Sequence, residues 1–352
     1  MSPRFSPIAA VALVALSSAA SAQTVPGFSV TTYATVTDPV RLAQGLNGEL
    51  YVGRDLLASG TSTPLKIWRV GAGGSPVVEV GNAPTPDPDV VALDVNGTIS
   101  GVPGSVLVAG LVNSSLGRIS AIHPDGSVAT LFESNAWINI SAMRFDHAGR
   151  LLFSAVDSDA VWVTTGNQPT ILAQTPGPSP VWMTVGPDDS IYVSDEVGIV
   201  KRYASNGTML DPLVANFGAF TAIDIAPGGP FGFELYGLRR SDGGLFRVLP
   251  RGVLQSVGTG FPTGTAISDI LFGACGELYV AIHPQNKLLQ IQGPSCACGA
   301  VQGADINDDG AVNASDLAIL LGAWGTNDCE SDFDGDGTVN ALDLAVLLGA
   351  WS

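Results

Sequence analysis

Acidic and amide side chains recur at fixed intervals between Asp305 and the C-terminus, with the spacing of a cation-binding loop. Oxygen ligands at loop positions 1, 3, 5, 7, 9 and 12, with glycine at position 6 for the turn, bind Ca²⁺. The first loop would supply Asp305, Asn307, Asp309, the backbone carbonyl of Ala311, Asn313 and Asp316. The second would supply Asp332, Asp334, Asp336, the backbone carbonyl of Thr338, Asn340 and Asp343. An oxygen-only donor set argues against zinc or copper, so the sequence predicts two Ca²⁺ ions.

The two loops belong to a duplicated unit. A similar apolar run follows each loop, Leu317–Trp324 and then Leu344–Trp351, and the step between the runs equals the step between the loops. Equal residue types at a fixed period indicate a repeated supersecondary unit, which makes an acidic surface turn the poorer interpretation. Position 12 is Asp rather than the Glu of an EF-hand, and the sequence has room for only one helix per loop.

This repeated loop and helix resembles a dockerin module, in particular the variant sometimes called GC-type, found at the C-termini of many secreted bacterial proteins. The resemblance implies a non-catalytic, Ca²⁺-dependent role in docking or anchoring, with a cohesin-like or cell-surface anchoring protein as partner. Cohesin-binding dockerins usually carry small hydroxyl residues at loop positions 10 and 11, where this chain has Ala314-Ser315 and Ala341-Leu342. Residues 299–352 also contain no Lys or Arg. These departures do not support cohesin as the partner, whereas the expected fold and metal are unaffected by them.

Composition and charge narrow the possible partners of the whole chain. It has 352 residues, of which 43 are Gly and 23 are Pro, and 13% are charged, a composition that favours many short strands and turns. The net charge is −17, and ten of the 32 acidic residues lie between residues 305 and 343. Nucleic acids and anionic membranes require a basic face, so neither is expected as a partner.

The N-terminal residues 1–22 have the pattern of a secretory signal peptide. Arg4 provides the basic region, Ile8–Leu16 the apolar core, and Ala20-Ser21-Ala22 a small-residue cleavage site before Gln23. No later stretch is apolar for long enough to span a bilayer. We therefore expect a secreted or cell-surface bacterial protein.

Export would permit disulfides among the four cysteines of the chain. Four cysteines allow three connectivities. The favoured pairs are Cys298–Cys329, within the C-terminal module, and Cys275–Cys296, at the end of the preceding domain. A zinc site is the poorer interpretation, because no paired CxxC spacing and no nearby histidine accompany these cysteines.

A second, looser repeat extends over residues 23–293. A turn followed by a β-rich run recurs six times at similar intervals, as in Gly48–Val52, Gly149–Phe153 and Asp189–Val193. An apolar segment precedes each run and another strand candidate follows it, and hairpin signals such as Asp125-Gly126 lead to a fourth strand. Four short antiparallel strands recurring about every 45 residues describe a propeller blade. The predicted fold is mainly β: a six-bladed β-propeller (23–293) followed by a small α dockerin-like domain (294–352) with two Ca²⁺-binding loop-helix repeats.

The ends of this domain provide a check on the propeller. The sixth unit lacks a fourth strand after Lys287–Ile291, whereas Phe28–Val36 precedes the first unit and has no blade of its own. Pairing these two segments would close the ring and remove two exposed sheet edges. Closure favours a six-bladed propeller over a β-sandwich or a β-helix.

The segment 181–207 resembles the repeats of NHL and SMP-30/gluconolactonase-like propellers. A lactonase of that kind needs a divalent cation at the centre of the propeller. Asp38 could replace the family's glutamate, but Ser179-Pro180-Val181 lacks its asparagine. The other acids that could reach the centre, or instead cap a strand or face a solvated turn, are Asp94, Asp224 and Asp269.

The remaining polar and aromatic candidates do not define a catalytic centre. The three histidines, His123, His147 and His283, lie in predicted turns or loops, where a solvated residue is the ordinary interpretation. The aromatic residues Trp137, Trp182 and Phe220 precede or begin inner strands, where they could bind a sugar ring or peptide or else pack between blades. No catalytic residue is assigned, so catalysis is left open and a binding role is favoured.

Three functions follow from this organisation. The preferred one is a secreted propeller that binds a protein or carbohydrate ligand and is anchored through a Ca²⁺-dependent dockerin-like module. The alternative is an SMP-30-like lactonase or a polysaccharide-active hydrolase displayed through its dockerin. The third is a structural envelope protein in which the propeller is only a spacer.

Overall fold

The computed structural model describes the domain between residues 23 and 293 apart from short gaps, together with parts of the C-terminal module. The described ranges are 23–54, 65–83, 88–113, 115–218, 221–227, 229–264, 267–273, 276–293, 304, 306–307, 311–325, 331, 333 and 339–351. The predicted signal peptide and all four cysteines lie outside these ranges. The signal peptide, the two disulfides and the domain boundaries therefore stay predictions.

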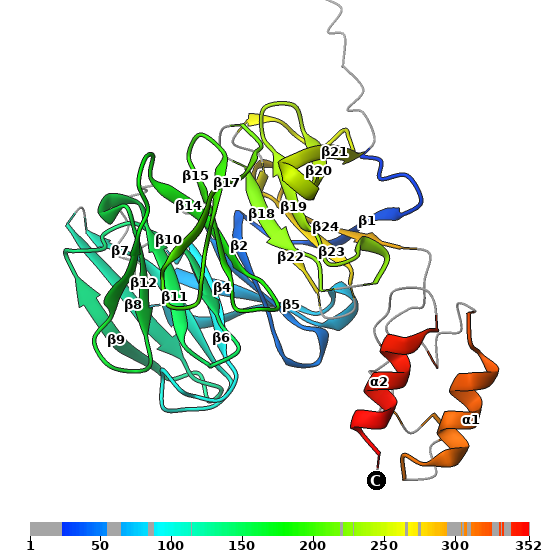
Figure 1. The fold of residues 1–352 in the computed structure, drawn as a ribbon. Helices are drawn as coiled ribbons and strands as arrows, with labels where there is room; N and C mark the ends of the chain where they lie inside the picture. Colours follow the sequence, from blue (N-terminus) through cyan, green and yellow to red (C-terminus); the bar gives the residue numbers. More distant parts are fainter. Residues whose placement is uncertain are drawn as a thin grey trace, which may run out of the picture.

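The described residues form six four-stranded antiparallel sheets followed by two helices (Figure 1). We number the sheets as blades 1 to 6. The first strand of each blade contacts the first strand of the next, from β2 through β6, β10, β14, β18 and β22 back to β2. This closed order defines a six-bladed propeller whose innermost strands surround a central axis, as the sequence predicted.

Blades 1 to 5 are each built from consecutive strands, and the strands of all six blades have four to nine residues. Blade 1 comprises β2 (Pro39–Gln44), β3 (Leu50–Arg54), β4 (Leu65–Val70) and β5 (Val77–Ala83). Blade 2 comprises β6 (Val90–Asp94), β7 (Ser105–Asn113), β8 (Leu116–Ile122) and β9 (Val128–Ser134). Blade 3 comprises β10 (Ile140–Phe145), β11 (Leu151–Ala155), β12 (Ala160–Thr164) and β13 (Thr170–Gln174).

The other blades repeat this arrangement. Blade 4 comprises β14 (Pro180–Val185), β15 (Ile191–Asp195), β16 (Ile199–Tyr203) and β17 (Met209–Asn216). Blade 5 comprises β18 (Ala222–Ile225), β19 (Leu235–Arg239), β20 (Gly244–Leu249) and β21 (Val253–Gly258). Blade 6 comprises β22 (Ile267–Phe272), β23 (Leu278–Ile282), β24 (Lys287–Gln292) and β1 (Ser29–Thr35).

Blade 6 closes the ring with strands from both ends of the domain. Strand β1 pairs antiparallel with β24, with Val30 opposite Ile291 and Ala34 opposite Leu288. The predicted closure is therefore confirmed. Because pairing across so long a stretch of chain is slow, we expect the last blade to form after the rest of the propeller.

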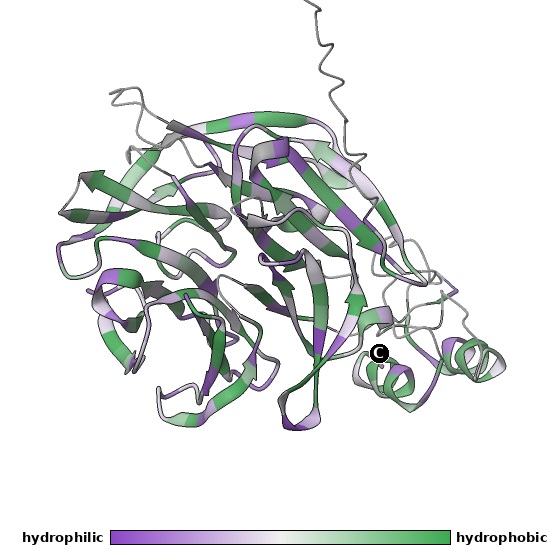
Figure 2. Ribbon diagram, turned by 90° about the horizontal axis from the view of Figure 1, so that it is seen from above, coloured by the Kyte–Doolittle hydropathy of each residue, from purple (hydrophilic) through white to green (hydrophobic). Residues whose placement is uncertain are grey.

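Burial falls from the middle of each blade to its outer edge. Every residue of β11 in blade 3 is buried, whereas the outer strand β13 of the same blade is mostly exposed. The buried strand Leu151–Ala155 is almost entirely apolar, as expected of a strand covered on both faces, whereas the outer strand Thr170–Gln174 has polar residues at both ends. Hydrophobic residues recur along the strands of all blades in Figure 2. The core therefore lies between neighbouring blades.

The C-terminal module has its own small core. Helix α1 (Ala314–Gly322) and helix α2 (Ala341–Gly349) contact each other and have nine residues each. The buried apolar residues of the described part of this module are Ala304, Ile306, Leu320, Val339 and Leu347. Helices shorter than about 12 residues are marginal on their own, so this module depends on packing and on its loops.

Candidate calcium loops and propeller hub

The described part of the predicted Ca²⁺ loops includes six of the twelve predicted ligands. These are Asn307, Ala311, Asn313 and Asp316 in the first loop and Asn340 and Asp343 in the second. The other six lie outside the described residues: Asp305, Asp309, Asp332, Asp334, Asp336 and Thr338. Both copies place the ligands of positions 9 and 12 at the start of their helix.

The last ligand of the first loop, Asp316, folds the loop back onto the helix. Its carboxylate is fully buried, and Oδ1 accepts hydrogen bonds from the backbone N–H groups of Ile306 (2.8 Å) and Asn307 (3.2 Å). Its Oδ2 accepts from the N–H of Asn313 at 2.8 Å. These N–H donors, that of Asn313 above all, lower the pKa of Asp316. The ionised form is therefore favoured, and it is the form that binds a cation.

The second loop repeats this geometry around Asp343. Its buried carboxylate accepts from the N–H of Phe333 at 2.6 Å and from that of Asn340 at 2.8 Å. In both copies the side-chain oxygen of the position-9 asparagine accepts from the N–H two residues later and so caps the helix. The donor set is made of carboxylate, carboxamide and backbone oxygens, and this set fits Ca²⁺.

The two helices and the residues just after them expose apolar side chains to solvent. We call this set the apolar helix face. Its members are between 39% and 52% exposed: Ile319, Leu321, Trp324, Leu342, Val346, Leu348 and Trp351. Three pairs among them are related by the repeat, so that Trp324 corresponds to Trp351. So many exposed large apolar side chains on so small a module favour a protein interaction site.

The centre of the propeller is crossed by the side chain of Arg41, which extends from blade 1. Its Nε donates to the carbonyl of Ser141 in blade 3 at 2.8 Å, and Nη2 donates to the carbonyl of Val181 in blade 4 at 3.3 Å. Its guanidinium also lies 4.7 Å from the ring centroid of Trp182 and within 3.9 Å of Asp269 in blade 6. One buried side chain therefore links four blades.

Two buried aspartates complete the hub. Asp269 accepts from the N–H of Leu42 at 3.0 Å and lies 3.9 Å from Arg144. Asp224 accepts from the N–H of Phe272 at 2.7 Å and from the hydroxyl of Thr184 at 2.5 Å. Burial raises the pKa of both carboxyl groups, and burial likewise lowers the pKa of Arg41. The ion pairs and hydrogen bonds of these buried side chains therefore link the inner strands of different blades.

The acidic residues considered for a central metal have other roles. Asp38 lies in a turn with φ of 51°, and its N–H donates to Asn286. Asp94 accepts from the N–H groups of Thr98, Ile99 and Ser100 and so orders the loop after β6. Within the described ranges, no three His, Cys, Asp or Glu side chains gather as metal ligands. The described hub aspartates pair with Arg41, with Thr184 and with backbone N–H groups of neighbouring blades.

The aromatic candidates pack between blades. Trp137 and Trp182 are 2% and 3% exposed, and Trp137 contacts Phe153 edge to face. Of the two predicted roles, ligand binding and core packing, these two tryptophans have the second. Phe220 lies outside the described residues. The histidines differ from one another: His123 contacts Ser105, His283 has a buried Nδ1, and His147 is exposed and contacts Asp189.

Sequence reasoning missed the arginines of the hub. Arg41 and Arg144 each stand inside an apolar inner strand, in the segments PVRLAQ and ISAMRF. A charged residue within a buried strand requires a partner there, because an unpaired buried charge is costly. That local signal was available, but the partners come from other blades, distant in the chain, which spacing does not reveal.

The fold and the loops together define a six-bladed propeller that carries a C-terminal module of two loop-helix repeats. Residues 303–349 match the model of the dockerin type I domain, and this segment is a dockerin of that type. Dockerin domains bind Ca²⁺ and take part in Ca²⁺-dependent assembly of extracellular bacterial proteins. No curated protein sequence matches the chain. Neither described helix is long and apolar enough to cross a lipid bilayer.

Solved structures resemble the propeller in fold. The PQQ-bound aldose sugar dehydrogenase of Streptomyces coelicolor matches with 15% identity and a TM-score of 0.55, over 76% of this chain and 99% of that one. A gluconolactonase of Xanthomonas campestris matches with 14% identity and a TM-score of 0.55, over 77% and 91%. A virginiamycin B lyase of Staphylococcus aureus matches with 19% identity and a TM-score of 0.51, over 71% and 79%. At these identities the likeness shows the fold alone.

Proposed function

We propose that this protein is an exported bacterial binding protein, whose propeller recognises a ligand and whose dockerin attaches it to a cohesin-like or cell-surface protein. Two Ca²⁺ ions order the docking module, each held by the six loop ligands named above. Ca²⁺ supplies the positive charge that the clustered acidic side chains need, because residues 299–352 contain no Lys or Arg. Metal binding and folding of the module are then coupled.

The observation that carries this proposal is the apolar helix face. Trp324 and Trp351 are 44% and 45% exposed although the module has a core in which they could be buried. A buried carboxylate ties each loop to the start of its helix, and each tryptophan lies two residues after the end of that helix. Large exposed aromatic residues on a fixed surface are typical anchors of protein interfaces.

The charge of the module indicates what surrounds the apolar contact on the partner. Ten acidic residues lie between 305 and 343, and two Ca²⁺ ions would offset four of their charges. The module therefore keeps a net negative charge. We expect a partner with an apolar centre and basic residues at its edge, so that its association slows as salt screens the attraction.

The enzymatic alternative is less well supported. An SMP-30-like lactonase needs a divalent cation among inner strands, and Arg41 crosses the propeller there with Arg144 beside it. Guanidinium groups repel a cation and cannot act as its ligands. The arrangement of the described hub residues thus favours binding over metal-dependent hydrolysis.

The docking role is tested with a purified type I cohesin module as the probe. The full chain in excess Ca²⁺ is titrated calorimetrically, together with Trp324→Ala, Trp351→Ala and the double variant. We expect the double variant to lose about 2 kcal/mol or more of binding free energy, the usual minimum for a hot-spot residue, at roughly unchanged Ca²⁺ affinity. Leu213→Ala serves as the control, because Leu213 is 57% exposed on propeller strand β17.

Three results would decide against the docking role as stated. Cohesin binding that persists in excess chelator would show that Ca²⁺ does not order the docking surface. A double tryptophan variant that binds like the unmodified chain would show that the apolar helix face is not the contact surface. Absence of cohesin binding by the unmodified chain would leave the structural-spacer function as the better interpretation of the module.

A further inference from the structure

A pocket of about 270 Å³ lies between blades 2 and 3, at the ends of inner strands β6 and β10. It is built from the loop after Asp94 and the turn around His147, and it opens to solvent. The side chains that face it and matter here are Leu93, Val95, Asn96, Thr98, Phe145 and His147. This volume accommodates one ring of a small organic ligand, at the lower end of ordinary ligand sites.

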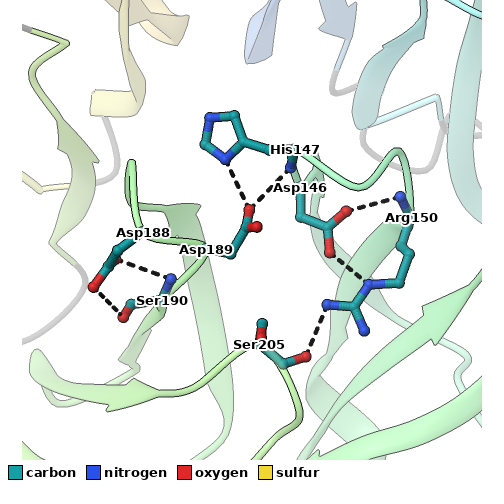
Figure 3. Close-up of polar contacts among 7 residues, drawn as sticks. All are labelled: Asp146, His147, Arg150, Asp188, Asp189, Ser190 and Ser205. Carbon is teal, nitrogen blue, oxygen red and sulfur yellow. Dashed lines mark hydrogen bonds and ion pairs between the residues drawn. The ribbon is translucent and has the colours of Figure 1, made fainter.

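Both walls of the pocket are fixed by buried carboxylates that accept hydrogen bonds from residues of their own loops. Asp94 is buried and accepts from three backbone N–H groups and from the hydroxyl of Ser100. Asp146 is buried and accepts from the N–H of Arg150 at 2.8 Å and from its Nε at 2.6 Å (Figure 3). Walls held in this way lose little conformational freedom when a ligand binds.

His147 has a defined orientation at the pocket although it is 65% exposed. Its backbone N–H and its Nδ1 both contact Oδ1 of Asp189, at 3.0 and 2.8 Å, across the boundary between blades 3 and 4 (Figure 3). Hydrogen bonds from His147 lower the pKa of Asp189, so the carboxylate is ionised and Nδ1 carries the proton. Nε2 is not used in this contact and can form a hydrogen bond with a hydroxyl group, which both donates and accepts.

Asn96 offers the complementary group from the other wall. Within the described residues its exposed carboxamide makes no hydrogen bond, so both its donor and its acceptor are available. The apolar side chains of Leu93, Val95 and Phe145 line the same pocket. Apolar surface with a few convergent polar groups fits a ring with C–H faces and hydroxyl edges, which is the chemistry of a sugar.

The charges near the pocket select against an anionic ligand. Asp94, Asp146 and Asp189 lie at or beside it, and Arg150 is held by Asp146 and by the carbonyl of Ser205. The carboxylates are also occupied by N–H donors, so they offer little to a cation. From this arrangement we infer that the pocket between blades 2 and 3 binds an uncharged saccharide. The inference names the ligand class for the propeller in the proposed function and rests on its binding role.

The experiment uses the full chain in Ca²⁺ and four soluble probes. D-Glucose, D-galactose and cellobiose are the uncharged sugars, and D-glucuronate is the anionic counterpart of glucose. Binding is followed by ligand-observed NMR and by calorimetry. We expect saturable binding of at least one uncharged sugar at millimolar concentration and weaker binding of glucuronate than of glucose.

Variants locate the binding to this pocket. His147→Ala and Asn96→Ala each remove hydrogen bonds, and we expect about tenfold weaker binding, equivalent to about 1.4 kcal/mol. His147→Gln retains an acceptor and recovers part of the affinity. His123→Ala is the matched control, because His123 lies in a similar turn, contacts Ser105 and does not line the pocket. The thermal transition of each variant verifies that the propeller is folded.

Binding of none of the uncharged sugars would overturn the inference, as would tighter binding of glucuronate. Equal affinity for the unmodified chain, His147→Ala and Asn96→Ala would also overturn it, since the sugar would then lie elsewhere. Saccharide binding is expected to persist in chelator, whereas cohesin binding is expected to vanish. The two functions can therefore fail independently.

Discussion

The propeller and the dockerin domain both bury carboxylates, but different groups surround them. In the propeller, Asp269 lies within 3.9 Å of Arg41 and of Arg144, so the cations come from other blades of the same domain. In the dockerin, Asp316 and Asp343 are buried in a segment without any Lys or Arg. The propeller thus contains its own counter-charges, whereas the dockerin must take them from solution.

This difference follows from the size of the two cores. The propeller buries apolar residues between all of its blades, and its described strands close a ring with β1 paired to β24. The described part of the dockerin buries five apolar residues under two nine-residue helices. A core of that size does not stabilise a domain alone, and small domains usually depend on metals or disulfides. On the proposed function, Ca²⁺ would therefore order the dockerin and leave the propeller unaffected.

Removal of Ca²⁺ should produce the largest difference in stability between the dockerin and the propeller. Excess chelator is expected to unfold the dockerin completely, since at Ca²⁺ concentrations about 1,000 times Kd the bound metal contributes about 4 kcal/mol. Hydrogen exchange followed by mass spectrometry measures this directly. Protection should disappear in residues 311–325 and 339–351 and stay unchanged in the propeller strands.

The propeller peptides act as the internal control in that experiment. Equal loss of protection in both regions would mean that the propeller also depends on the metal. Helix protection that survives the chelator would contradict the coupling of folding to Ca²⁺ binding.

The opposite perturbation acts on the propeller alone. Arg41→Met should destabilise it by about 3 kcal/mol, because the substitution leaves Asp269 buried with only Arg144 nearby. Urea denaturation monitors the loss, and calorimetry should show the Ca²⁺ affinity of the dockerin unchanged. The double variant with Asp269→Asn should recover part of the stability, since the buried carboxylate that lost Arg41 is then no longer charged. A double variant less stable than Arg41→Met would show that the ion pair is not the reason.

The propeller and the dockerin also differ in how much the sequence reveals. The six blades and their closure were predictable because local signals repeat: an apolar strand, a turn such as Asp125-Gly126, and a further strand. The Ca²⁺ loops were predictable because all ligands of one site lie within one short loop. In both cases the information is local or periodic.

The hub and the pocket could not be predicted in the same way. Arg41 finds its partners in three other blades, at Ser141, Val181 and Asp269, none of them near it in the chain. His147 was predicted to be a solvated turn residue, and it is exposed, but its orientation depends on Asp189 in the next blade. Contacts between blades are set by the closure of the ring, so their residues carry no spacing that a sequence pattern could reveal.

A matched pair of substitutions in helix α2 tests the same difference between the dockerin and the propeller, with the smallest expected effect. Leu347 is fully buried and Leu348 is 52% exposed, although they are neighbours. Leu347→Ala should cost about 2 kcal/mol, near the lower end for a buried leucine because so small a core can partly collapse. Since folding and metal binding are coupled, this loss should appear as about thirtyfold weaker Ca²⁺ binding in calorimetry, with the propeller's thermal transition unchanged.

Leu348→Ala should leave Ca²⁺ affinity unchanged and weaken only cohesin binding, because its side chain belongs to the apolar helix face and not to the core. Equal Ca²⁺ affinities for Leu347→Ala and the unmodified chain would mean that the module is folded before the metal binds. The carboxylates of Asp316 and Asp343 would then be stabilised by backbone N–H groups alone. In that case the dockerin would resemble the propeller in supplying all of its own stabilising contacts, and Ca²⁺ would act on docking without acting on folding.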